Sequence, residues 1–356
     1  MTLTDFYKTY SSDTLAACSN QRLAFLDKPT KITGRVAYKL RNGGEYYALL
    51  FINETDSTVS NGTYDANTPG EEYVIHTMRV GLSPSHESVP ETWQTVTVDG
   101  KGEKTVAPGE KYFTDPIPLT AKAGDYFWYE ITCTAKTYPF HAELLLDSKT
   151  LNAEGHWISD HAFPTPVMIG SDRKVKKKVA FLGDSITQGI GTEWESYAHW
   201  AAKIAEGMPS SYSFWDLGIG CARAYDAASD GVWLDRVKKC DVATVCLGVN
   251  DLLNGRTADE LINDISTVLD LLREAGVKTI LFTVPPFDMS GTPCEYWYKT
   301  NNAIREELSK KSDCIFDFAA VLGRPEPNQH LSVYGGHPNA EGCAVLAKAF
   351  LEAGIL

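Results

Sequence analysis

The pattern of short apolar segments changes character part way along this chain of 356 residues. Up to about residue 165, runs rich in Val, Ile, Thr and aromatic residues alternate with turns built from Gly, Pro, Asn and Asp. Five of these runs are predicted strands: Ile32–Leu40, Tyr46–Ile52, Tyr73–Val80, Thr92–Val98 and Tyr126–Thr134. Many short strands at this spacing favour an antiparallel β-sandwich or jelly roll.

From Lys178 onward, strand-like and helix-like segments alternate. The predicted strands are Lys178–Leu182, Ser213–Ile219, Val242–Leu247, Thr279–Val284 and Cys314–Phe318. The predicted helices are Ser196–Glu206, Gly231–Lys239, Ala258–Ala275, Glu295–Lys310 and Asn339–Ala353. Such alternation implies an α/β domain whose five-stranded parallel sheet carries helices on both faces.

The boundary between these two regions falls in a stiff and then basic stretch. Pro164-Thr-Pro166 is followed by the basic run Ser171–Lys178. We therefore predict an accessory β domain over residues 1–165, a linker over 166–177 and an α/β domain over 178–356. Because the surrounding chain is acidic, the basic run is interpreted as a solvated linker rather than a nucleic-acid patch.

Charge and composition exclude several classes of protein. The net charge of −13 argues against a nucleic-acid partner and disfavours an anionic membrane surface. The sequence has neither a recognisable signal peptide nor a run of 18 apolar residues, so we expect a cytoplasmic protein without a membrane partner. The eight cysteines form no C-x-x-C pair, and we expect reduced thiols, no metal site and no cofactor.

A serine stands directly behind the first predicted strand of the α/β region, in Gly183-Asp-Ser-Ile186. The carboxyl end of a parallel strand is where open α/β folds bind their ligands. Ser185 can act there as a nucleophile if the chain supplies a base and an oxyanion site. Taken alone, the same four residues are equally typical of an ordinary turn.

Three further segments follow predicted strands or precede the last helix. Asp216-Leu-Gly-Ile-Gly220 offers main-chain N–H groups, and Gly248-Val-Asn-Asp251 places the amide of Asn250 at a strand end. His337, between two glycines and a proline, is suited to accept a proton near neutral pH. Each segment has an ordinary structural explanation, but their joint occurrence in this order favours an active site.

In these four blocks the chain resembles the SGNH/GDSL hydrolases from about residue 178 to its end. The order of regions resembles the two-domain carbohydrate acetyl esterases, in which a jelly roll precedes the hydrolase domain. The resemblance implies a flavodoxin-like three-layer fold and ester hydrolysis through an acyl-enzyme. Ser185 would be the nucleophile and His337 the general base. The oxyanion would be bound by the Ser185 main-chain N–H, the Asn250 amide and the N–H of Gly220 or Cys221.

Two positions depart from the family's usual pattern. Cys221 stands where the family has a donor glycine, and its side chain would narrow the acyl pocket or force φ below zero. Tyr334 stands where the family has the aspartate that orients the histidine. Either a main-chain carbonyl orients His337, giving a Ser–His dyad, or a distant carboxylate does. The carboxylate candidates are Asp317, Glu326 and Glu341.

Other polar residues near these blocks are expected to play supporting roles. His330 is the rival base, but its flanking residues indicate an exposed loop. Asp184 and Asp251 are expected to organise loops rather than to take part in catalysis.

Aromatic residues in the predicted loops of the α/β region indicate the class of substrate. Trp194 and Trp297 lie in such loops, and flat rings beside polar groups suit sugar rings. Because no long apolar lid is visible, we expect a short acyl group, most simply acetyl, on a small-molecule or oligosaccharide substrate. The alternatives are another acyl hydrolase, such as a thioesterase or lysophospholipase, or a non-catalytic glycan-binding protein. The sequence indicates neither the sugar nor the oligomeric state.

Overall fold

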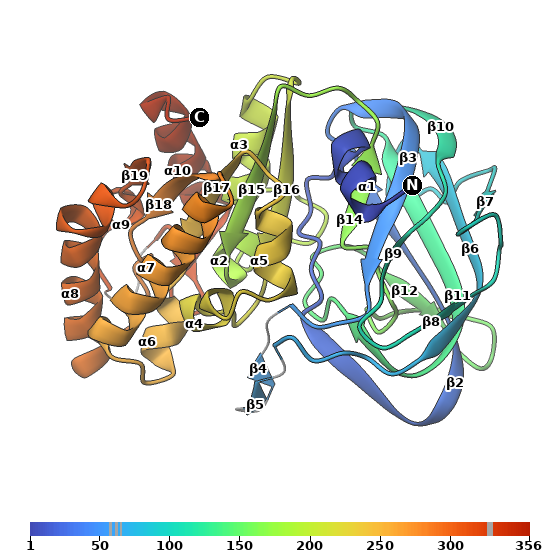
Figure 1. Ribbon diagram of the computed structural model, residues 1–356, viewed down its shortest axis with the longest axis horizontal. Helices are drawn as coiled ribbons and strands as arrows, with labels where there is room; N and C mark the ends of the chain where they lie inside the picture. The colour runs from blue at the N-terminus through green and yellow to red at the C-terminus, as the bar shows by residue number, and fades with distance from the viewer. Residues whose placement is uncertain (57–58, 61–62, 65, 326–329) are drawn as a thin grey trace. The chain divides into compact units, whose positions relative to one another are not determined.

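The computed structural model describes residues 1–56, 59–60, 63–64, 66–325 and 330–356 (Figure 1). The chain forms two compact units. The first contains Met1–Lys176 and Ser213–Trp215, and the second contains Lys177–Tyr212 and Asp216–Leu356.

The first unit is rich in antiparallel β structure, as the sequence predicts. It begins with helix α1 (Leu3–Thr9). One sheet contains β1 (Ser11–Ser12), β14 (Met168–Ser171), β3 (Gly43–Ile52), β10 (Ile117–Lys122) and β9 (Lys111–Phe113). The other contains β13 (Trp157–Ser159), β12 (Lys149–Leu151), β2 (Arg22–Lys39), β11 (Tyr126–Phe140), β6 (Tyr73–Ser83), β7 (Gln94–Val96) and β8 (Lys104–Val106). A further short pair is β4 (Val59–Ser60) with β5 (Thr63–Tyr64).

The register of the larger sheet shows how its core is built. Val36, Tyr129 and Val80 are direct neighbours across β2, β11 and β6, and all three are fully buried. The next row is Arg35, Glu130 and Arg79, whose side chains point to the opposite face because the side-chain period of a strand is two. Arg79 Nε donates to Glu130 Oε1 over 2.7 Å. The second face of the sheet therefore carries paired charged side chains in this row.

One predicted boundary differs from the structure. Residues 168–171 fall in the predicted linker, yet they form β14 and pair with β3 and β1. Their apolar residues Met168 and Ile169 are buried in that sheet. The gain from burying them explains why this segment is ordered as a strand rather than left in solvent.

The second unit is built on a parallel five-stranded sheet. Its order is β16 (Tyr212–Gly218), β15 (Lys177–Gly183), β17 (Val242–Cys246), β18 (Lys278–Phe282) and β19 (Cys314–Phe316). Every residue of β17 is buried. A parallel sheet covered on both faces has strands that are apolar on both sides, which is why these strands appear in the sequence as continuous apolar runs.

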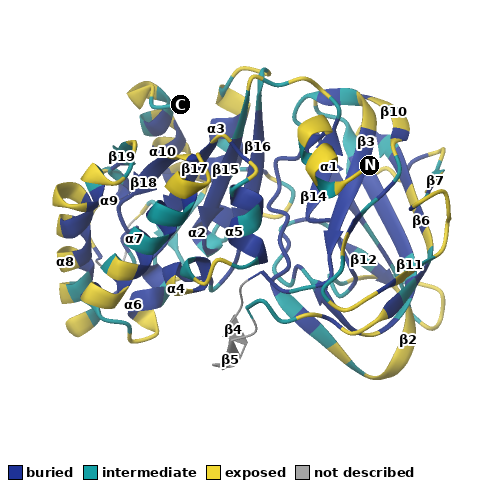
Figure 2. Ribbon diagram, viewed as in Figure 1, coloured by how far each residue is buried: buried dark blue, intermediate teal, exposed yellow. Residues whose placement is uncertain are grey.

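Helices flank this sheet in two sets (Figure 1). In one set, α7 (Ala258–Glu274) contacts α4 (Ala224–Ala228), α6 (Val249–Leu253) and α8 (Thr292–Glu306). In the other, α10 (Ala340–Ala353) contacts α3 (Trp200–Gly207) and α9 (Phe318–Leu322). The remaining helices are α2 (Ser185–Gln188), α5 (Val232–Val237) and the 3₁₀ turn Leu308–Lys310. The longer helices expose one face and bury the other (Figure 2).

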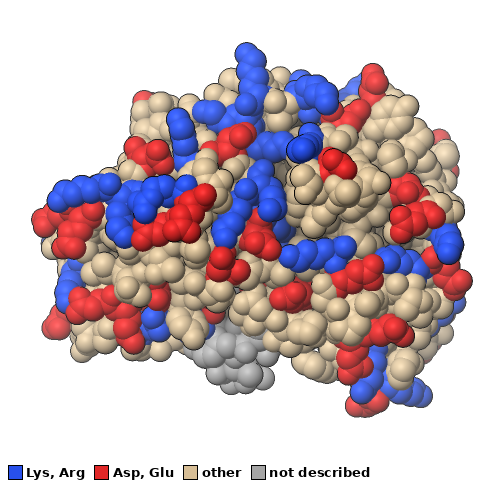
Figure 3. Space-filling view, viewed as in Figure 1, with Lys and Arg blue, Asp and Glu red and all other residues tan. Residues whose placement is uncertain are grey.

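The surface of the protein carries charged residues of both signs (Figure 3). Lys and Arg side chains are interspersed with Asp and Glu over the face drawn in Figure 3. Among the described residues, no helix combines the length and the apolar character needed to cross a bilayer. The same part of the chain contains no group of three or more His, Cys, Asp or Glu side chains arranged to hold a metal ion.

Candidate active site

Ser185 is the first residue of α2, and one residue, Asp184, separates it from the end of β15. Asp184 caps this short helix, because its Oδ1 accepts a hydrogen bond from Ile186 N over 2.9 Å. Gly183 allows the helix to turn back directly onto the strand, since a Cβ there would lie 1.9 Å from Thr187 Oγ1. The sequence of this turn therefore fixes Ser185 at the carboxyl edge of the sheet.

His337 is carried by a tight hairpin between β20 (Ser332–Val333) and β21 (His337–Pro338). The three turn residues Tyr334, Gly335 and Gly336 all have positive φ, at 47°, 80° and 132°. Glycine adopts such angles without steric cost, whereas tyrosine does so rarely. The turn directs the main-chain carbonyl of Tyr334 toward the side chain of His337.

The two predicted catalytic side chains meet in the structure. Ser185 Oγ lies 2.8 Å from His337 Nε2, and His337 Nδ1 lies 2.8 Å from the carbonyl oxygen of Tyr334. Because a carbonyl only accepts hydrogen bonds, this contact assigns the proton to Nδ1 and leaves Nε2 free to accept the serine proton. The ring of Phe287 packs against the imidazole nearly at a right angle, with ring centroids 5.1 Å apart.

The carboxylates considered from the sequence have other contacts. Asp317 caps α9 by accepting from Ala320 N, and it pairs with Arg305 over 2.8 Å. Glu341 is exposed in the first turn of α10, and Glu326 lies outside the described residues. His330, the rival base, is exposed, and its carbonyl accepts from Asn339 Nδ2.

The predicted oxyanion donors other than Ser185 lie in α6 and in the loop after β16. Asn250, in α6, donates from Nδ2 to the carbonyl of Ala222 over 3.0 Å and faces Asp184 Oδ2 at 3.5 Å, a long and therefore weak contact. The loop after β16 packs on α2 through Gly218, where a Cβ would lie 2.2 Å from Gln188 N. This loop continues into Gly220 and Cys221.

Cys221 keeps the backbone conformation of a glycine. Its φ is +66°, which differs from the negative φ that the sequence analysis considered for a side chain at this position. A left-handed conformation costs a non-glycine residue about 1–2 kcal/mol. Cys221 therefore holds a backbone conformation that a glycine adopts without strain.

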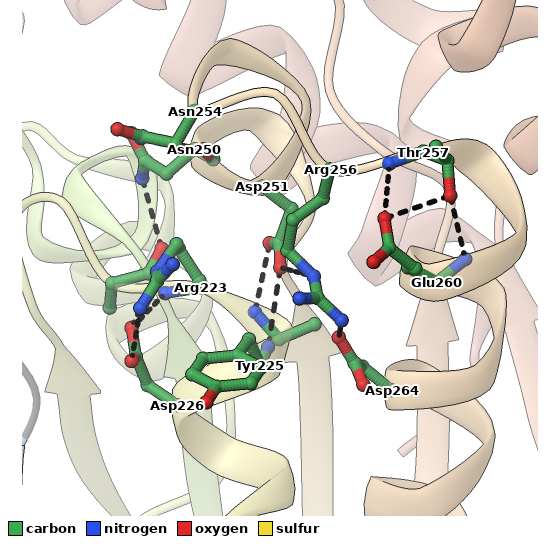
Figure 4. Close-up of polar contacts among 12 residues, drawn as sticks. Arg223, Tyr225, Asp226, Asn250, Asp251, Asn254, Arg256, Thr257, Glu260 and Asp264 are labelled. Carbon is green, nitrogen blue, oxygen red and sulfur yellow. Dashed lines mark hydrogen bonds and ion pairs between the residues drawn. The ribbon is translucent and has the colours of Figure 1, made fainter.

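A polar network connects α4 to α6 (Figure 4). Asp251 accepts hydrogen bonds from Ala224 N over 2.9 Å and from Tyr225 N over 3.2 Å. Burial raises the pKa of Asp251 to about 6 despite these bonds. Arg256 joins the network because its Nε lies 3.8 Å from Asp251 Oδ1, and it also pairs with Asp264. Asp251 is thus placed to organise the loops beside Asn250.

The two predicted substrate-binding tryptophans differ in environment. Trp194 lies in a loop with 50% of its surface exposed. Trp297, expected in a loop, lies instead in α8 and is 3% exposed. Its indole N–H donates to the carbonyls of Val284 and Pro285. Its ring supports the loop after β18 and is too deeply buried to lie against a substrate, so the prediction of Trp297 as a substrate-binding residue is wrong.

We expect the substitution Tyr334→Asn to leave kcat/KM for 4-nitrophenyl acetate within about threefold of the unchanged protein. The group that faces His337 Nδ1 belongs to the main chain, and asparagine tolerates a left-handed φ better than most residues. Steady-state hydrolysis of this small ester is the measurement. A loss of 100-fold or more would show that the tyrosine side chain itself orients the base.

A second expected result concerns Asp184, which is fully buried. Burial, opposed by the bond from Ile186 N and reinforced by Asp251, raises the pKa of Asp184 to about 7, against 3.8 for the unperturbed group. Between pH 3.8 and 7 the folded protein therefore retains a proton at Asp184 that the unfolded chain has lost. Its contribution to the free energy of unfolding must fall as the pH rises through this window, by roughly 4 kcal/mol in total.

Asp184→Asn isolates this effect because asparagine does not titrate. We expect the difference in free energy of unfolding, unchanged protein minus variant, to decrease from pH 4.5 to pH 7.5. Urea unfolding at three pH values measures it. A difference that is independent of pH would mean that Asp184 is ionised throughout.

One family of known proteins is similar to part of the second unit. Residues 181–345 match the model of the GDSL-like Lipase/Acylhydrolase family. These residues include Ser185, Asn250 and His337. The matched segment is less than half of the chain, and it shows a similarity to this family. No curated protein matches the chain.

Several solved structures resemble about half of the chain. A lipolytic protein of the G-D-S-L family from Veillonella parvula is 17% identical, covers 50% of this chain and 99% of its own, and has a TM-score of 0.44. The acetyl xylan esterase AlAXEase is 23% identical, with 50% and 100% covered and a TM-score of 0.41. A carbohydrate esterase of family 3 from Talaromyces cellulolyticus is 25% identical, with 50% and 96% covered and a TM-score of 0.40.

Proposed function

We propose that this protein is a serine esterase that removes short acyl groups, above all acetyl, from carbohydrate. The observation that carries the proposal is the contact of Ser185 Oγ with His337 Nε2 at 2.8 Å, on an imidazole whose other nitrogen faces a carbonyl. A nucleophile, a base and an orienting acceptor in this order are the requirements for acyl transfer.

In the proposed mechanism, His337 Nε2 takes the proton of Ser185 as Oγ attacks the ester carbonyl carbon. The tetrahedral intermediate places a negative charge on the former carbonyl oxygen. The Ser185 N–H, the Asn250 amide and the N–H of Gly220 or Cys221 bind this oxyanion. The bond from the carbonyl carbon to the sugar oxygen then breaks, and this oxygen takes the proton from His337 and leaves as a hydroxyl group, with Ser185 acylated. A water molecule, activated by His337 in the same way, then releases the acid and restores Ser185.

The carbonyl of Tyr334 changes the electrostatics of this mechanism relative to a triad. A carboxylate would hold the ring and also stabilise the positive imidazolium, whereas a carbonyl contributes a hydrogen bond without a full charge. The dyad therefore relies more on orientation than on charge. The tight hairpin that carries both Tyr334 and His337 supplies this orientation within one short segment.

The proposed subsite for the sugar lies next to His337, the general base. Gly191 packs on the hairpin, since a Cβ there would lie 3.0 Å from His337 Cβ and 2.7 Å from the Pro338 carbonyl oxygen. The exposed Trp194 follows three residues later in the same loop. A half-exposed indole on a loop fixed against the base supports a subsite for the flat face of a sugar ring.

The proposal also covers the domain architecture of the chain. The first unit would be a jelly-roll accessory domain, with the hydrolase domain over residues 178–356 in a flavodoxin-like arrangement. The roles of Ser185, His337 and the oxyanion donors belong to the same proposal.

A series of 4-nitrophenyl esters from acetate to octanoate tests the choice of acyl group. We expect kcat/KM to fall roughly tenfold or more beyond butyrate, because a methylene group that does not fit its pocket costs about 1–3 kcal/mol. Acetate release from acetylated oligosaccharides, with the deacetylated sugar as control, tests the alcohol. A preference for octanoate or for thioesters would replace the acetyl esterase with the thioesterase or lysophospholipase alternative.

A further inference from the structure

A buried histidine–aspartate pair lies beside the short helix α2 that carries the predicted nucleophile. His199, the residue before α3, is 4% exposed, and Asp216, in β16, is 3% exposed. Nε2 of His199 faces Oδ2 of Asp216 at 3.3 Å. Both atoms are buried, and neither has a well-formed hydrogen bond to any described residue. The proposed mechanism uses neither side chain.

The aspartate of this pair holds the loop that carries two predicted oxyanion donors. Asp216 Oδ1 accepts a hydrogen bond from Gly218 N over 2.8 Å. Gly218 lies against the backbone of α2, where a Cβ would be 2.2 Å from Gln188 N and 2.6 Å from its Cα. Gly220 and Cys221 follow two and three residues later. The position of Asp216 therefore sets where this loop leaves the sheet.

The histidine of the pair supports the other end of α2. Gly189 ends this helix with φ +109°, and its N–H donates to the carbonyl of Ser185 over 3.0 Å. A Cβ on Gly189 would lie 2.7 Å from His199 Cβ and 2.8 Å from its Cγ. The imidazole thus packs directly against the turn that closes α2. The adjacent Trp200 donates its indole N–H to the carbonyl of Ile186 over 3.0 Å.

We propose that His199 and Asp216 are positioning residues that hold the nucleophile helix and the oxyanion loop in one fixed arrangement. The inference rests on the proposed function only for its kinetic consequence. Its structural content is that the attraction between the two side chains joins α2 to residues 216–222. A displacement of about 1 Å between a nucleophile and its oxyanion donors is enough to lower the rate of acyl transfer about 100-fold.

The variant His199→Leu removes the nitrogen that faces Asp216 and keeps an apolar side chain of suitable size against Gly189. His199→Gln is the matched control, because its amide can place a donor where Nε2 stood. Hydrogen–deuterium exchange is measured for residues 183–191, 216–222 and 258–274. We expect His199→Leu to raise exchange roughly tenfold in the first two segments and to leave α7 unchanged, while His199→Gln stays near the unchanged protein.

The kinetic measurement is made on the same variants with 4-nitrophenyl acetate. We expect His199→Leu to lower kcat roughly 10–100-fold with KM within about threefold, and His199→Gln to recover most of that loss. If His199→Leu does not fold, the nearly isosteric Asp216→Asn replaces it. That variant keeps an oxygen for Gly218 N and replaces the carboxylate oxygen that faces His199 by an amide nitrogen, and it is expected to raise exchange in the same two segments.

The outcomes separate the two proposals. Exchange that is unchanged in both segments, or that rises equally in α7, would overturn the positioning role. If the unchanged protein does not hydrolyse the ester, the proposed function fails, while the exchange measurements still decide whether the pair joins α2 to the loop.

Discussion

Ser185→Ala and His337→Ala are each expected to lower kcat/KM for 4-nitrophenyl acetate by at least roughly 10⁴-fold, the scale on which a nucleophile and its base act as a unit. The 2.8 Å contact between Oγ and Nε2 is the physical reason, since without either atom no activated oxygen remains to form the acyl-enzyme. Steady-state rates measure the loss. Labelling by a fluorophosphonate identifies the reacting side chain.

Two features of this result distinguish catalysis from a general loss of structure. The double variant is expected to lose little more than either single variant, because the two residues act in the same step. His330→Ala is the matched control, since His330 is exposed and lies on the same segment as the hairpin. Full activity in Ser185→Ala or His337→Ala would overturn the assignment of these residues, whereas an unchanged protein without esterase activity would favour the glycan-binding alternative.

The sheet of the second unit could be predicted because its strands are buried on both faces. A strand such as β17, in which every residue is buried, has to be apolar throughout, and this makes it visible in the sequence. Helix α7 was equally visible, since the capping box of Thr257 and Glu260 precedes a regular apolar stripe. Short helices such as α2, α4, α6 and α9 have only four or five residues, too few to display a helical period.

Only part of the candidate site could be predicted from the sequence. Ser185 and Asn250 could be placed at one sheet edge because both follow parallel strands, which end on the same side, whereas His337 reaches Ser185 from the hairpin of β20 and β21. The acceptor for His337 could only be stated as two alternatives, since the direction of the Tyr334 carbonyl depends on three successive positive φ angles. Trp297 was assigned to a loop although the predicted helix Glu295–Lys310 contains it; the residue lies in α8, and packing buries its indole.

We expect Gly336→Ala to impair His337 as the general base, although the histidine itself is unchanged. Gly336 has φ +132°, and a Cβ there would lie 2.8 Å from Phe287 Cα and 3.1 Å from the Pro286 carbonyl oxygen. Both contacts are to backbone, which cannot rotate away, so the hairpin must shift, and His337 is the next residue. We expect kcat for 4-nitrophenyl acetate to fall roughly 100-fold. We also expect the melting temperature to fall by about 5–10 °C, which corresponds to roughly 3 kcal/mol.

Gly335→Ala provides the matched control, because it introduces the same methyl group one residue earlier. Its φ of +80° also disfavours alanine, by about 1–2 kcal/mol. Its nearest contact, however, is Phe287 Cε1 at 3.0 Å, the far end of a side chain that can turn aside. The control should therefore lose some stability and keep kcat within about fivefold. Equal losses of kcat in the two variants would mean that glycine's flexibility in the turn, rather than the close approach at Gly336, keeps His337 in line with Ser185.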